Sequence, residues 1–265
     1  MVRMVSRSSV QAGIPADHSG FGRFAEILRD KGKFALRHYR AGQTVVMQGD
    51  EELRVFVVKE GWGCISKCLY GGQRHLIEFP LRGDVVDFSM AAMGQQEEFS
   101  ALADMVVWEG PAARMETLAR AEAGASRFLA DAARRQRAIF IERLAGVALR
   151  DASTRIAHFL LEISARLCLS GVPARDGYEC PLTQQDLADT LGMTPIHVNR
   201  MLREARALGL YEFRRGRVRF LNYAATVEFA DFDTAYLAGR DGARSLPHNP
   251  PRRGGININP ATFNV

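Results

Sequence analysis

The side chains best suited to recognising another molecule lie in one stretch of this 265-residue chain. Residues 194–222 contain seven arginines and two acids, a net charge of +5, which equals the net charge of the whole chain. Arginine can donate two parallel hydrogen bonds to guanine, and asparagine can pair with adenine in the same bidentate way. The concentrated charge indicates a polyanion partner; on charge alone, a solvated basic face is the alternative.

Two short helices joined by a sharp turn are expected to position these side chains. Thr183 is the predicted N-cap of the first helix, with Asp186 at the third helical position, close to a capping box. Gly192 supplies the positive φ of the turn, and Thr194 then caps a second helix that begins at Pro195. This spacing is typical of a helix-turn-helix, whose second helix enters the major groove of double-stranded DNA.

The second helix is predicted to bury one face and to present the other. Its inward positions are Val198, Met201, Leu202 and Ala205, and a hairpin with Gly216 at its tip follows as a wing whose arginines suit phosphates. A plain helical hairpin with a solvated face is the less favoured alternative. The predicted DNA-binding residues are Thr183, Thr194, Ile196, His197, Asn199, Arg200, Arg203, Arg215 and Arg217.

The first half of the chain has the pattern of short strands. Runs rich in β-branched and aromatic residues alternate with glycine-containing turns at a spacing of about 8–12 residues, which is typical of a sandwich, jelly roll or barrel. We predict a short helix at Phe21–Leu28 and then seven or so strands at residues 34–39, 44–47, 54–59, 64–70, 75–79, 85–88 and 100–108.

A helical pattern begins near Pro111 and continues for about forty residues, after which Asp151 caps a second helix, Arg155–Leu169. The long helix has one continuous stripe at spacings of three and four, so it needs a partner along its length. Packing on its own sheet is one possibility, and pairing with a second copy is the one we favour. The predicted dimerisation residues are Leu129, Ala132, Gln136, Ile139, Arg143 and Val147.

The remaining composition argues against several classes of protein. No apolar run approaches the ~20 residues of a membrane span, and the first twenty residues lack the apolar core of a signal peptide, so we expect a cytoplasmic protein without a membrane partner. The six histidines are scattered and no catalytic motif is present, so we expect no enzyme and no catalytic residues. A thiol enzyme using Cys64 and Cys68 is the least implausible exception, and a nucleotide-binding module with a vestigial DNA domain is the other rival.

The four cysteines, at positions 64, 68, 168 and 180, are too few and too scattered for a disulfide framework or a four-cysteine metal site. We therefore expect reduced, structural thiols and no metal ligands. Cys180 is a candidate redox residue, because it lies shortly before the first helix of the predicted helix-turn-helix, where a modified thiol could misplace that helix.

Residues 21–237 resemble the Crp/Fnr family of transcription regulators. The resemblance rests on Gly42-Gln43, Gly49-Asp50, Val57–Gly61, Gly83-Asp84, Arg155–His158 and the helix-turn-helix run; His197–Arg200 and Phe232–Leu237 are similar to a subgroup common in alphaproteobacteria. It implies an eight-stranded effector roll, a long dimerisation helix, a C-terminal winged helix, and a homodimer on a near-palindromic site. RNA polymerase is an expected further partner if the protein is an activator.

The sequence also departs from this family. Cyclic-nucleotide-binding members carry Gly-Glu-Leu after the Gly-Asp pair and an Arg-Ser or Arg-Thr pair about ten residues later, whereas this chain has Asp87-Phe88-Ser89 and Glu98-Phe99-Ser100. Acids without an arginine would repel a phosphate. No cysteine precedes Cys64, whereas the oxygen-sensing members carry an N-terminal cluster. We therefore expect no cofactor, neither cyclic AMP nor an iron–sulfur cluster. Ile196 stands where relatives often place glutamate, so no operator sequence follows from the resemblance.

The predicted fold class is α+β, with two ordered domains joined by a helix. We predict a disordered tail (1–20), a β-roll of the cyclic-nucleotide-binding jelly-roll type as sensor (21–123), a dimerisation helix (124–150), a winged helix-turn-helix (151–239) and a second disordered tail (240–265).

Overall fold

The computed structural model describes residues 20–88 and 96–237, so both predicted tails, apart from Gly20, lie outside the described residues. Helix α1 (Phe21–Asp30) precedes a set of eight strands, and all their pairings are antiparallel. These strands are β1 (Ala35–Tyr39), β2 (Thr44–Val46), β3 (Arg54–Glu60), β4 (Gly63–Cys68), β5 (Arg74–Glu78), β6 (Val85–Asp87), β7 (Glu98–Ala101) and β8 (Met105–Pro111).

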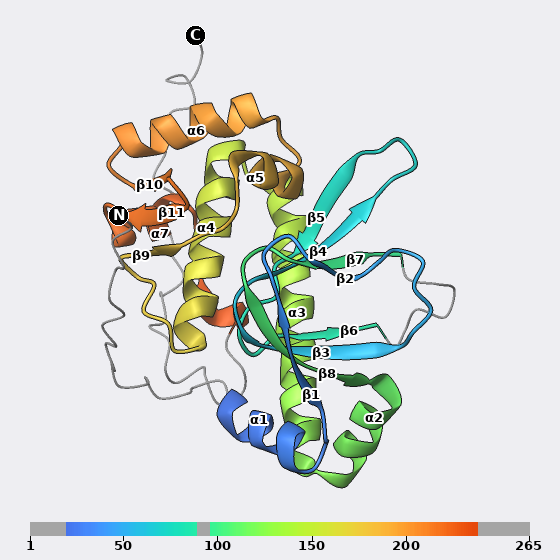
Figure 1. Cartoon of the computed structure of the whole chain (residues 1–265). Helices are drawn as coiled ribbons and strands as arrows, with labels where there is room; N and C mark the ends of the chain where they lie inside the picture. The colour runs from blue at the N-terminus through green and yellow to red at the C-terminus, as the bar shows by residue number, and fades with distance from the viewer. Residues whose placement is uncertain (1–19, 89–95, 238–265) are drawn as a thin grey trace, which may run out of the picture.

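The eight strands form a roll of two four-stranded sheets, with orders β1-β8-β3-β6 and β2-β7-β4-β5 (Figure 1). Apolar side chains from both sheets, among them Phe56, Val86, Phe99 and Met105, form the core between them. The single strand predicted at residues 100–108 is wrong: the chain leaves one sheet at Ala101 and joins the other at Met105. Residue types alone do not mark this crossing, because the connecting residues Leu102–Asp104 include two apolar ones.

The forty-residue helical run is two helices, α2 (Ala112–Ala121) and α3 (Ala123–Leu149). They are separated at Glu122, whose backbone is extended (φ −123°, ψ 106°). The break lets α2 pack against the start of α3 beneath the roll, where Met115 and Leu118 of α2 share an apolar cluster with Phe128 of α3. The residue of lowest helix propensity near the break is Gly124, but α3 includes it in its first turn, so packing fixes the position of the turn.

The C-terminal domain begins with α4 (Ala152–Leu169), and the Asp151 side chain accepts a hydrogen bond from the Thr154 N–H as its predicted cap. The following elements are β9 (Gly177–Glu179), α5 (Gln184–Leu191), α6 (Pro195–Ala207), β10 (Tyr211–Arg214), β11 (Arg217–Phe220), α7 (Tyr223–Phe229) and the 3₁₀ helix η1 (Thr234–Leu237). Strands β10, β11 and β9 make a small antiparallel sheet.

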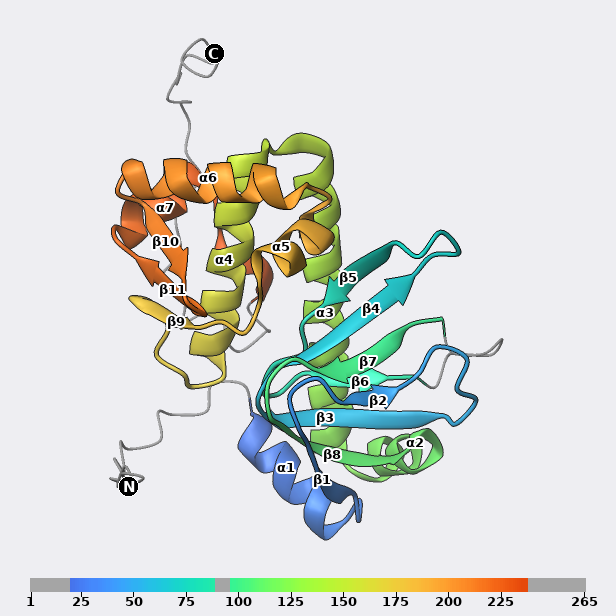
Figure 2. The ribbon, with the colours of Figure 1, turned by 45° about the horizontal axis from the view of Figure 1, so that its top comes forward.

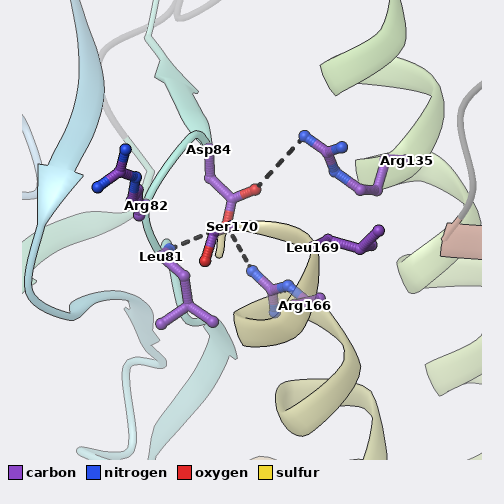
Figure 3. A pocket seen from close by; sticks show the side chains of 7 residues that line it. All are labelled: Leu81, Arg82, Asp84, Arg135, Arg166, Leu169 and Ser170. Atoms are coloured by element: carbon purple, nitrogen blue, oxygen red, sulfur yellow. Dashed lines mark hydrogen bonds and ion pairs between the residues drawn. The ribbon is translucent and has the colours of Figure 1, made fainter. Parts of the chain in front are cut away.

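The roll and the C-terminal domain are joined by more than the chain connection. One continuous apolar cluster includes Trp62, Leu76 and Phe79 from the roll, Ile139 from α3 and Phe159 from α4. Figure 3 shows the adjoining polar contact, in which the carboxylate of Asp84 lies between guanidinium groups from α3 and α4. Arg166 Nη2 lies 2.6 Å from Asp84 Oδ2, and Arg135 Nη2 lies 4.0 Å from Oδ1. The two domains are therefore packed as one body.

Candidate nucleic-acid interface

Helix α6 lies across the outer end of the C-terminal domain, with α4 and α5 behind it (Figure 2). Its inner face is buried as predicted, through Val198, Met201, Leu202 and Ala205. Its outer face carries Ile196, whose side chain is 84% exposed, together with the exposed residues Arg200 and Arg203. An apolar residue and two long cations therefore face outward from one helix.

The capping predictions for both helices are confirmed. The Thr183 side chain accepts a hydrogen bond from the Asp186 N–H while the Asp186 carboxylate accepts one from the Thr183 N–H, which completes a capping box. The Thr194 hydroxyl accepts from the His197 N–H, and Pro195 occupies the first turn. Gly192 has the predicted positive φ (66°). Thr183 and Thr194 thus fix the geometry of the two helices through their side chains, and both residues are also exposed to solvent.

Asn199 has an environment different from that of its neighbours. Its side chain is half-buried, and Nδ2 donates a 2.9 Å hydrogen bond to Oε1 of Gln184, the first residue of α5. Arg200 is exposed and lies 3.9 Å from Glu204, one helical turn away on α6. His197 is half-buried near the start of the same helix. Asn199 and Arg200 therefore differ in their surroundings: the first is hydrogen-bonded to α5, and the second is exposed to solvent.

The wing is the hairpin of β10 and β11, with Arg215 (φ 51°) and Gly216 (φ 72°) at its tip. Arg217 is exposed and pairs with Glu179 of the neighbouring strand at 2.8 Å. A groove of about 560 Å³ separates the wing tip from the start of α5, and Gln184, Arg214 and Arg215 line it. Gln184 and Arg214 are not among the residues predicted from the sequence. Arg214 carried a signal in its charge, but the position of Gln184 beside Asn199 depends on how α5 crosses α6.

The predicted dimerisation stripe is corrected at Ile139, which is buried inside the chain, and Gln136 and Arg143 also make contacts within the chain. Ile139 is 2% exposed in the shared apolar cluster. Gln136 Nε2 donates to Glu78 Oε2 (2.7 Å), and Arg143 Nη2 donates to Glu162 Oε1 (3.0 Å). Leu129 and Ala132 are half-buried, and Val147 is exposed. The inward stripe thus serves the chain's own packing, which was the less favoured possibility.

A second stripe on α3 is apolar and exposed. Phe140, Leu144 and Val147 follow one another at intervals of four and three residues, and their side chains are 40%, 72% and 56% exposed. Ile141 and Leu149 extend this surface. Sequence periodicity marks both stripes of this helix, and only the tertiary structure shows which one faces inward.

The prediction of Cys180 as a redox residue is also corrected. Its side chain is 1% exposed, and burial raises the pKa of the thiol to about 12. The reactive form of cysteine is the thiolate, so a protonated and inaccessible thiol is inert at neutral pH. Burial likewise raises the pKa of the Cys64 thiol to about 12. The four cysteines are unpaired.

Three aromatic rings fill the interior of the roll next to the positions where the sequence departs from its relatives. The ring centroids of Phe56, Phe88 and Phe99 are 5.4–6.4 Å apart. Phe88 follows β6 and Phe99 lies on β7, and both side chains are buried. The guanidinium of Arg54 lies 5.4 Å from the ring centroid of Phe56, whereas that of Arg82 lies 5.2 Å from the ring centroid of Phe21 in α1. Ser89 lies outside the described residues.

In the described part of the chain, no three His, Cys, Asp or Glu side chains are grouped as metal ligands. Over the same residues, none of the helices is both long enough and apolar enough to cross a membrane.

An effector-type β-roll packed through a long helix onto a winged helix-turn-helix defines a class of protein: a DNA-binding transcription regulator. Comparison with known proteins agrees. The model of the cyclic nucleotide-binding domain matches residues 36–122, and that of the Crp-like helix-turn-helix domain matches residues 154–225. The chain belongs to the Crp/Fnr family, whose members are transcription regulators.

Named relatives support this assignment. The chain is 26% identical over 190 residues to the nitrogen fixation regulation protein FixK of Bradyrhizobium diazoefficiens, covering 71% of this chain and 78% of the relative. It is 26% identical over 191 residues to the transcriptional activator protein FnrA of Stutzerimonas stutzeri, covering 70% of this chain and 76% of that relative. In fold it is similar to FixK2 from Bradyrhizobium japonicum, with a TM-score of 0.64 and 22% identity over 74% of this chain and 96% of that structure. It is also similar to a CooA mutant from Carboxydothermus hydrogenoformans, with a TM-score of 0.63 and 17% identity over 77% of this chain and 94% of that structure.

Proposed function

We propose that this regulator binds a near-palindromic DNA site as a homodimer, with α6 of each copy in the major groove and the wing on flanking phosphates. The two-sided character of α6 carries the proposal: one face is packed in the domain core, and the other presents Ile196, Arg200 and Arg203 to solvent. A recognition helix reads base edges with residues of this outer face near its N-terminus. Such a protein acts in the cytoplasm, and RNA polymerase is its further partner if it activates transcription.

The homodimer is supported by the exposed stripe Phe140-Leu144-Val147 on α3. Intervals of four and three residues are those of a coiled-coil seam, in which two helices pair along their length. Two copies related by a two-fold axis would present two α6 helices, and a two-fold protein matches a two-fold DNA sequence.

We propose further that neither a cyclic nucleotide nor an iron–sulfur cluster controls this protein. A cyclic phosphate that leaves water needs a cation or several donors in exchange. Phe88 and Glu98 stand where the nucleotide-binding relatives place glutamate and arginine, and Phe88 packs against Phe56 and Phe99. For the cluster, the support is the spacing of the four cysteines, at 64, 68, 168 and 180, which is not that of the grouped thiolates that hold such a cluster.

Selection of bound duplexes from a random pool tests DNA recognition. We expect an enriched inverted repeat with half-site centres about one helical turn, 10–10.5 base pairs, apart or a multiple of that. The Arg200→Ala, Arg203→Ala double variant is the matched control, and it should enrich this repeat weakly or not at all. A wild-type protein that enriches no sequence would contradict the proposal.

Calorimetry with cyclic AMP and cyclic GMP at millimolar concentration tests the absence of nucleotide control. We expect no heat above that of dilution. Saturable binding in the micromolar range would overturn this part of the proposal without affecting DNA recognition.

A further inference from the structure

The contact between Gln184 and Asn199 joins the two helices of the helix-turn-helix at the site where DNA is expected. Gln184 is the first residue of α5, and Asn199 lies in the second turn of α6. Both side chains are half-buried, and their 2.9 Å hydrogen bond is the one side-chain to side-chain bond that the described residues form between α5 and α6. We propose that Gln184 is a positioning residue, which orients the Asn199 carboxamide for bidentate pairing with adenine. This inference rests on the proposed function.

The hydrogen-bonding capacity of the two amides supports this role. A carboxamide has two N–H donors and an acceptor oxygen with two lone pairs. Asn199 uses one N–H for Gln184, which leaves its second N–H and its oxygen, and these are the two groups that pair with N7 and N6 of adenine. Gln184 uses its oxygen in this bond, and its side chain also lines the groove that Arg214 and Arg215 line.

The benefit of such a contact is preorganisation. The terminal torsion of asparagine is broad, so an unconstrained carboxamide adopts many orientations that cannot pair with a base. Holding the amide before DNA arrives lowers the conformational cost of forming the base contact. Gln184 also borders the groove beside the wing. Its hydrogen bond to Asn199 therefore links the start of α5, at this groove, to the carboxamide on α6 that is proposed to read a base.

The test measures base preference at one position of the selected site, as the ratio of affinities for the preferred base pair and its three replacements. Asn199→Ala should lower the preference for one A·T pair by about tenfold or more. Gln184→Ala should lower the same preference by about two- to tenfold. In the Asn199→Ala background, Gln184→Ala should have no further effect on it. A purely structural role would instead weaken binding to all duplexes equally and leave this ratio unchanged.

Two variants sharpen the result. Gln184→Glu keeps an acceptor for Asn199 Nδ2, so it should retain the base preference even though its negative charge weakens binding to all duplexes. Gln185→Ala is the matched control, because Gln185 donates to Asp189 Oδ1 (2.6 Å) within α5 and is exposed. It should change neither the base preference nor the binding to all duplexes.

The inference is overturned if Gln184→Ala preserves the preference that Asn199→Ala removes, or if Gln184→Glu loses it as fully as Gln184→Ala. If the wild-type protein selects no sequence at all, the proposed function fails first and this inference falls with it.

Discussion

Arg200 and Arg217 are both exposed arginines of the C-terminal domain, but they stand on different surfaces. Arg200 projects from α6 and has only a 3.9 Å ion pair with Glu204. Exposed i,i+4 pairs of this kind contribute a few tenths of a kcal/mol, so Arg200 can leave Glu204 to bind a base edge at little cost. Arg217 is the first residue of β11 on the wing, where the sugar–phosphate backbone is the expected contact.

We therefore predict different effects of the two substitutions. Arg200→Ala should weaken binding to the preferred site by about 1–3 kcal/mol and relax specificity at one base pair. Arg217→Ala should weaken all duplexes alike and lower the salt slope by about one. Arg217 is a better choice than Arg215, whose φ of 51° makes its replacement a change in the turn itself. Fluorescence anisotropy over a range of salt concentrations measures both effects. An unchanged site preference in Arg200→Ala would remove this residue from base reading.

His158 carries a second prediction at the residue scale. It is buried in α4, with its ring centroid 5.0 Å from that of Phe232 and 6.1 Å from that of Tyr236. Burial, with a further contribution from Arg150, lowers its pKa to about 4, although Glu142 acts in the opposite direction. The unfolded state, with an ordinary histidine pKa near 6.5, then binds more protons between pH 6.5 and pH 4. This group therefore makes the protein less stable as the pH falls through that window, by about 3 kcal/mol in total.

His158→Phe retains an aromatic ring against Phe232 and Tyr236 but cannot take up a proton. Between pH 7 and pH 4, the unfolding free energy of the wild type should fall by about 3 kcal/mol more than that of the variant. Urea unfolding at several pH values gives the comparison. Acids that do not contact His158 contribute alike to both proteins, so the difference reports the titration of His158 together with its pairing with Glu142. Parallel pH profiles of the two proteins would contradict the prediction.

At the scale of elements, the sequence was informative wherever a signal was local. The capping box of Thr183 and Asp186, the cap of Thr194 and the left-handed Gly192 each depend on residues a few positions apart, and all were predictable. The break at Glu122 and the crossing between β7 and β8 depend on contacts with distant residues, so they were not. The two stripes of α3 show the same limit, because periodicity marks a face but not what packs against it.

The exposed stripe of α3 gives a prediction for assembly. Leu144→Asp places a charge in the proposed seam while leaving the packed face of the helix intact. We expect folded monomers by sedimentation and greatly weakened binding to the inverted repeat.

Ile139→Asp, which the sequence alone would favour for this experiment, is the informative contrast. Ile139 is 2% exposed inside the chain, so a carboxylate there should unfold the protein instead of separating two copies. Circular dichroism distinguishes these outcomes. A Leu144→Asp protein that stays dimeric would exclude this stripe as the interface.

At the scale of the whole molecule, the roll and the C-terminal domain are held together by charge as well as by apolar packing. The Arg166 side chain, 3% exposed, donates from Nη2 to Phe79 O (2.8 Å) and to Asp84 Oδ2 (2.6 Å). A second contact lies at the β4–β5 hairpin, where Arg74 Nη2 is 3.0 Å from Asp186 Oδ1. Asp186 is also the capping residue of α5, so the roll contacts the helix-turn-helix at the residue that fixes its first helix. The orientation of α6 relative to α3 is thereby tied to the roll.

Asp84→Ala tests this coupling. It removes the main partner of a buried guanidinium and the acceptor for the Leu81 N–H, so we predict a loss of about 3 kcal/mol of unfolding free energy. Of the two tryptophans, Trp108 lies on β8 of the roll and Trp62 lies in the apolar cluster that joins the two domains, so fluorescence reports on the roll and on this contact, while far-ultraviolet circular dichroism reports mainly on the helices. The two urea transitions should coincide in the wild type and separate in the variant, because the roll loses its charged contact with α4.

Arg29→Ala, which removes an exposed ion pair with Asp30, is the control and should change neither midpoint. Coincident transitions at an unchanged midpoint in Asp84→Ala would show that the apolar cluster alone joins the two domains.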